Sequence, residues 1–166
     1  MPTGDIMREQ AVLTLPLRQW AAAEASSAVS ELEQGKVLFL PELAFTLSEQ
    51  EMPLLDPTLV DPKRKNISYQ PLSGKLTGVA VAERRQQVQQ LLERYYQSCR
   101  QLIAGLLPEY QEALHHPTGS LRLHPVSAWR ATSSWRKDDS RLHVDAFPSR
   151  PNYGERILRI FTSINP

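Results

Sequence analysis

The sequence has a single cysteine, few aromatic residues and no long apolar run. Cys99 is the only cysteine among 166 residues, which excludes an intrachain disulfide and a zinc ribbon and fits a reducing compartment. No stretch approaches the roughly 18 consecutive apolar residues of a membrane span. Residues 1–9 contain Asp5, Arg8 and Glu9 instead of the apolar segment of a signal peptide. We therefore expect a cytoplasmic protein.

An excess of charge of either sign is also missing. Nineteen Lys and Arg residues stand against 18 Asp and Glu residues, which leaves a formal charge of +1. This balance gives no electrostatic reason to expect a nucleic-acid partner. The 41% of hydrophobic residues excludes a wholly disordered chain and suffices for one ordinary core, so we expect residues 1–166 to form a single domain.

The first part of the chain contains short elements and loops. The small residues at 21–30 predict a surface helix, with Gly35 in the position of a C-terminal cap. Residues 36–40 form an apolar run closed by proline and predict a buried strand. Proline and glycine punctuate residues 56–78, where we expect a long ordered loop.

The clearest helix is predicted over residues 81–107 and ends before Pro108. Its apolar residues recur in steps of three, four and one, which places them on one continuous stripe. Cys99 lies on this stripe, where a thiol is usually inert packing and not a nucleophile. The residues of the stripe are Val88, Leu91, Leu92, Tyr95, Cys99, Leu102, Ile103 and Leu106.

Extended segments dominate the last part of the chain. We expect them over residues 120–124, 126–130, 141–145 and, as the longest, 156–164, where apolar side chains alternate between two faces. Helices followed by strands indicate an α+β fold with a helical layer on an antiparallel sheet or barrel. The sequence stops at a turn signal, Asn-Pro, with no returning strand, so we expect the last strands of the fold to be missing.

One short motif carries metal chemistry. In His143-Val144-Asp145, residues two apart on a strand point the same way, so an imidazole and a carboxylate project side by side. With one more histidine, these ligands form the two-histidine, one-carboxylate face of non-haem Fe(II) oxygenases. Taken alone, the motif is a weak signal and favours a structural histidine that is hydrogen-bonded to a nearby carboxylate.

Longer strings of residues resemble the iron- and 2-oxoglutarate-dependent Kdo hydroxylases. The resemblance extends from about residue 35 to 166. It involves several runs of matching residues in addition to the spacing of His143 and Asp145. The strings are residues 35–41 (GKVLFLP), 65–69 (KNISY), 134–149 (SWRKDDSRLHVDAFPS), 154–161 (GERILRIF) and 165–166 (NP).

This resemblance implies a double-stranded β-helix core (jelly-roll or cupin-like). About residues 1–118 would form a helical and loop layer, and about residues 119–166 the first core strands. It implies hydroxylation of the sugar Kdo in lipopolysaccharide with Fe(II), 2-oxoglutarate and O2, and His143 and Asp145 match the first two iron ligands. The family's third ligand is a later histidine, followed by a basic residue for 2-oxoglutarate. The sequence has no histidine after His143, so we expect the C-terminal part of the site to be absent.

Other charged and polar residues are less specific candidates for binding the substrate, the metal or a membrane. Arg141, Arg159 and Arg130 are candidates for binding the anionic groups of a Kdo-containing glycolipid, against the alternative of ordinary surface charge. His124 is a candidate replacement for the third iron ligand, although a core or hydrogen-bonded histidine is the preferred interpretation. The basic residues 63–65 leave open a peripheral contact with the inner membrane, although a solvated loop is the preferred interpretation.

Two other functions remain open at this stage. The chain would be a catalytically inactive short relative that binds a glycolipid or another protein, or a 2-oxoglutarate oxygenase that acts on a different anionic metabolite. The quoted residues do not distinguish the substrate.

Overall fold

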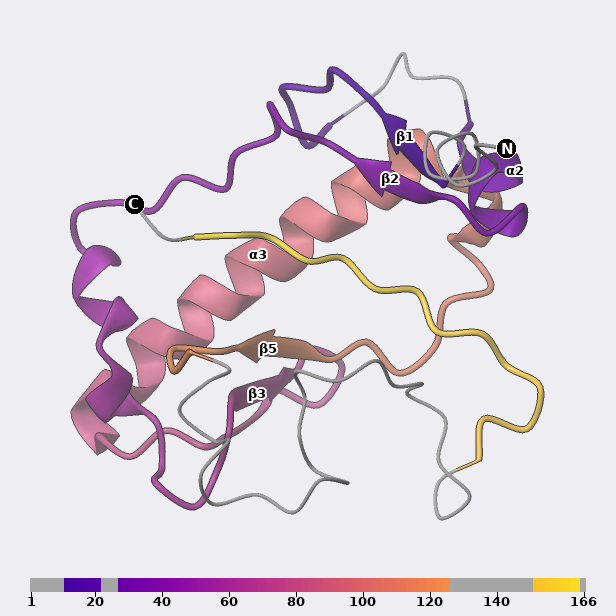
Figure 1. The fold of residues 1–166 in the computed structure, drawn as a ribbon. Coiled ribbons are helices and arrows are strands. Elements are labelled where there is room, and N and C mark those ends of the chain that lie inside the picture. The colour runs from indigo at the N-terminus through magenta and orange to yellow at the C-terminus, as the bar shows by residue number, and fades with distance from the viewer. Residues whose placement is uncertain (1–10, 22–26, 126–150, 165–166) are drawn as a thin grey trace, which may run out of the picture.

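A single long helix organises the molecule. The structure is a computed structural model and describes residues 11–21, 27–125 and 151–164. Helix α3, Arg85–Leu106, runs through the described part, with the short strands β1 and β2 beside its C-terminal end and strands β3 and β5 beside its N-terminal half. Residues 151–164, yellow in Figure 1, cross the helix between these two groups of strands.

The predicted helix and its apolar stripe are confirmed. A 3-10 turn, Ala82–Arg84, leads into α3, and a second one, Pro108–Tyr110, follows its end. Tyr95, Cys99 and Ile103 are half-buried, and the other stripe residues are fully buried: Val88, Leu91, Leu92, Leu102 and Leu106. Among the described residues, no helix is long and apolar enough to cross a membrane.

A three-stranded antiparallel sheet packs on the N-terminal half of α3. Its strands are β3 (Ile67–Gln70), β4 (Lys75–Thr77) and β5 (Gly119–Leu121), in the order β4-β3-β5. Alternate residues point to the helix, as the two-residue period of a strand requires. Ile67, Tyr69, Leu76 and Leu121 are therefore buried in one core cluster with the first residues of the helix stripe.

The prediction of a long loop over residues 56–78 is wrong, because β3 and β4 form a hairpin there. Two 3-10 turns, Met52–Leu55 and Pro57–Leu59, precede the hairpin. Its strands have only four and three residues, so local propensity is weak, and their burial against α3 stabilises them. Gly74 closes the turn with φ +66°, a conformation that favours glycine.

A second core cluster lies at the C-terminal end of α3. Strand β1, Val12–Thr14, pairs in parallel with β2, Val37–Phe39, and Leu38 packs against the cluster around Leu102 and Leu106. The strand predicted at 36–40 is therefore confirmed, but its predicted burial is wrong. Val37 and Phe39 are 62% and 53% exposed because this pair of strands has only one covered face in the described part.

Helix α2, Val29–Glu33, connects these strands and is shorter and later than the helix predicted at 21–30. Part of the predicted range, residues 22–26, lies outside the described residues. Gly35 follows the helix with φ +83°, and its N–H donates to the Leu32 carbonyl at 2.9 Å. The predicted glycine cap is thus confirmed.

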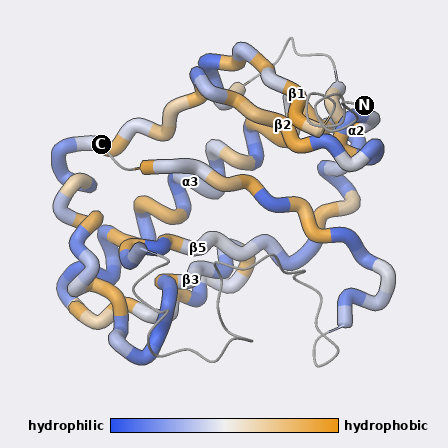
Figure 2. The backbone as a smooth tube through the Cα atoms, viewed as in Figure 1, coloured by the Kyte–Doolittle hydropathy of each residue, from blue (hydrophilic) through white to orange (hydrophobic). Residues whose placement is uncertain are grey.

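The segment 151–164 is extended but forms no β-strand. Its predicted alternation is correct: Leu158, Ile160 and Ile164 pack on the two core clusters, whereas Ile157 and Phe161 are 48% and 85% exposed. Figure 2 shows both apolar and hydrophilic residues along it, and because the apolar ones include adjacent pairs in the sequence, both faces carry apolar side chains. The predicted strand at 156–164 is wrong because none of the described residues pairs with it in a ladder.

The other predicted extended segments have two outcomes. The segment at 120–124 is confirmed in part, because β5 covers Gly119–Leu121 with Leu121 buried and Leu123 half-buried. The segments at 126–130 and 141–145 lie outside the described residues.

Candidate functional site

Most of the residues predicted to form the iron site lie outside the described part of the chain. This applies to the metal ligands His143 and Asp145 and to the anion-binding candidates Arg130 and Arg141. Arg159 alone is described, as an exposed side chain between Leu158 and Ile160. The metal site therefore stays a prediction from the sequence.

The described residues contain no complete metal site of their own. Within residues 11–21, 27–125 and 151–164, no three His, Cys, Asp or Glu side chains are grouped so that they could hold a metal ion. His124, the candidate replacement ligand, is half-buried just after β5. His115 and His116 are exposed in the loop before β5. Nothing in this part of the chain supports His124 as a metal ligand.

Helix α3 holds the two described segments that flank residues 126–150. On one side, Leu121 of β5 is buried in the same cluster as Leu92 of the helix. On the other side, the Tyr95 hydroxyl lies 2.9 Å from Thr162 Oγ1 and donates to the Ile160 carbonyl at 3.3 Å. The helix therefore fixes the chain before and after the segment that carries the His-x-Asp motif.

Cys99 behaves as the sequence predicted. The thiol is half-buried beside Tyr95 on the inner face of α3, and burial raises its pKa, although a hydrogen bond with Tyr95 opposes this effect. A raised pKa disfavours the nucleophilic thiolate at neutral pH. The thiol is therefore part of the packing and not a reactive site.

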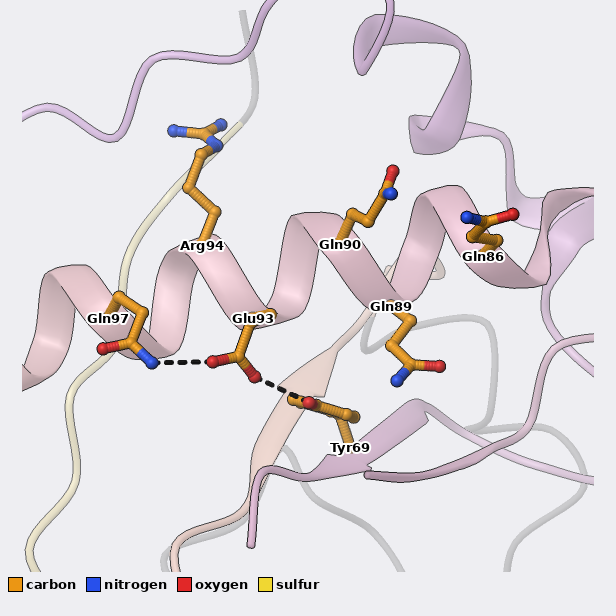
Figure 3. A pocket seen from close by; sticks show the side chains of 7 residues that line it. All are labelled: Tyr69, Gln86, Gln89, Gln90, Glu93, Arg94 and Gln97. Atoms are coloured by element: carbon orange, nitrogen blue, oxygen red, sulfur yellow. Dashed lines mark hydrogen bonds between the residues drawn. The ribbon is translucent and has the colours of Figure 1, made fainter. Parts of the chain in front are cut away.

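The outer face of α3 carries a shallow trough, lined mainly by glutamine side chains, that the sequence interpretation missed. Figure 3 shows its two walls, each formed by side chains four residues apart on the helix. One wall consists of Gln86, Gln90 and Arg94, and the other of Gln89, Glu93 and Gln97. The ring of Tyr69, from β3, lies beside the second wall.

Two hydrogen bonds hold the Glu93 side chain in this trough in place. Its carboxylate accepts hydrogen bonds from the Tyr69 hydroxyl at 2.6 Å and from Gln97 Nε2 at 2.7 Å. These two bonds, the one from Tyr69 first, hold the pKa of Glu93 below its usual range, and the same contact raises the pKa of Tyr69. Glu93 is thus ionised at neutral pH, and Tyr69 keeps its proton.

Arg94 is held on the other wall by partners far away in sequence. Its Nε and Nη2 donate to the two carboxylate oxygens of Glu51 at 3.0 and 2.7 Å, and Nη2 also donates to the Thr46 carbonyl. The guanidinium lies 4.1 Å from the centroid of the Phe45 ring. Arg94 therefore anchors residues 45–51 to α3, and its charge is already paired.

Comparisons with known proteins identify the family. A sequence model of 3-deoxy-D-manno-oct-2-ulosonic acid (Kdo) hydroxylase matches residues 18–166. The chain belongs to the Kdo hydroxylase family. The match includes the His143-Val144-Asp145 motif and confirms the resemblance seen in the sequence. A search of curated protein sequences gave no match.

Solved structures of the Kdo hydroxylase KdoO agree with this assignment. The cobalt(II) complex superposes with a TM-score of 0.77 at 38% identity and covers 88% of this chain and 50% of KdoO. The complex with α-ketoglutarate and Fe(III) gives 0.74 at 37% identity, over 87% and 49% of the two chains, and the apo form gives 0.76 at 37% over the same shares. KdoO is described as a non-haem Fe(II), α-ketoglutarate-dependent dioxygenase. The present chain spans about half its length.

Proposed function

We propose that this chain is the part of an Fe(II)- and 2-oxoglutarate-dependent Kdo hydroxylase that supplies the first two iron ligands. The observation that carries the proposal is the family match over residues 18–166, which contains His143 and Asp145 in the expected motif. The structural match to KdoO, which covers 88% of the chain, also supports it. We place these ligands on a strand of a double-stranded β-helix core.

The donor set fits the metal. An imidazole and a carboxylate two residues apart are the ligand types that non-haem Fe(II) uses, and 2-oxoglutarate is a chelating partner for the remaining positions. When bound, the iron with its cosubstrate and O2 would supply the oxidising chemistry of hydroxylation. No histidine follows His143 in the sequence, and nothing in the described residues supports His124 as the third protein ligand.

The remaining residues have positioning and binding roles in this proposal. Helix α3 holds the chain on both sides of the motif through Leu121 and Tyr95. Arg130, Arg141 and Arg159 would bind the carboxylate of Kdo or the phosphates of the glycolipid through charge-assisted hydrogen bonds. A glycolipid substrate implies a cytoplasmic protein at the periphery of the inner membrane.

The test compares ligand variants with a matched histidine variant. The chain is assayed, together with any segment that follows Pro166 in its natural reading frame, for succinate release and for addition of one oxygen atom to Kdo-lipid A. We expect His143→Ala and Asp145→Ala to abolish both products and His115→Ala, at an exposed position, to retain them.

Three other results would change the proposed function. Full activity of His143→Ala or Asp145→Ala would contradict the ligand assignment. A folded wild-type protein that binds Kdo-lipid A without releasing succinate would favour the inactive glycolipid-binding relative. Succinate release with another anionic metabolite, but not with Kdo-lipid A, would assign a different substrate to the same chemistry.

A further inference from the structure

We draw no further inference here: the strongest candidate, the exposed apolar side chains on the outer faces of β2 and of the segment 151–164, with Phe39 and Phe161 among them, carries nothing, because nothing in the described part of the structure shows what covers them.

Discussion

The sheet β4-β3-β5 and the segment 151–164 both pack one face on α3, but their outer faces differ: Gln70 and Lys75 of the sheet are polar, whereas the outer residues of the segment include apolar ones. In the sheet, Ile67 and Leu76 are 0% and 2% exposed, because α3 covers their face. In the segment, the inner residues pack on the same helix, but Phe161 on the outer face is 85% exposed. Alternation therefore determines which residues share a face, whereas the presence of a second layer determines whether both faces are buried.

The largest effect should come from truncating the buried face. Ile67→Ala removes a fully buried side chain and should lower the free energy of unfolding by about 2–5 kcal/mol. Ile157→Ala removes the same atoms from a side chain that is 48% exposed and should change it by about 0.5 kcal/mol. Urea unfolding of both variants measures the difference, and equal losses would show that the segment is as well packed as the sheet.

A smaller effect should follow from cutting the bond between the segment and the helix. Tyr95→Phe removes the hydroxyl that contacts Thr162 and Ile160 and should cost about 1 kcal/mol. Hydrogen exchange should become faster over residues 158–164 and stay unchanged in β3. Thr162→Val serves as the partner in a double-mutant cycle. Additive losses would indicate that the two hydroxyls do not interact.

The smallest effect concerns the ion pair at Arg94. Burial alone would raise the pKa of Glu51, but the hydrogen bonds from Arg94 and from the Ser48 backbone outweigh it and lower the pKa from its ordinary value of 4.5. The pair therefore stabilises the fold at pH values above 4.5, and this contribution disappears as the pH falls through the lower native pKa.

A substitution at Glu51 makes this pH dependence measurable. Glu51→Gln should cost at most about 1 kcal/mol at neutral pH, because the pair is partly exposed. In acid, the variant and the wild type should become equally stable. Glu49→Gln, at an exposed neighbouring position, is the control and should show little difference at either pH. A cost for Glu51→Gln that persists in acid would contradict the assigned role of the charge.

Buried faces are easiest to predict from the sequence where apolar residues keep the same spacing over a long segment. Helix α3 repeats its apolar spacing over about five turns, so its buried face could be listed residue by residue. The hairpin at 67–77 was not predictable in this way, because two strands of four and three residues give no clear period. The parallel pairing of β1 with β2 joins residues 25 positions apart and has no local signal.

The candidate sites differ in the same way: a contiguous motif was predictable, whereas a contact between distant residues was not. The family and the His143 and Asp145 ligands were predicted from contiguous strings, and the family assignment is confirmed by residues 18–166. The ligand positions stay a prediction, since they lie outside the described residues. The trough joins Tyr69 to Glu93 across two elements, and no spacing in the sequence indicates that contact.

The most direct test of the account is whether His143 and Asp145 bind the metal. Cobalt(II), which is bound in one KdoO structure, is titrated into the chain under anaerobic conditions with 2-oxoglutarate, and its visible absorption reports coordination. With any segment that follows Pro166 in the natural reading frame included, we predict one saturable site in the wild type and in His115→Ala, and its loss in the double variant His143→Ala with Asp145→Ala. Identical cobalt(II) binding by that double variant and the wild type would contradict the account.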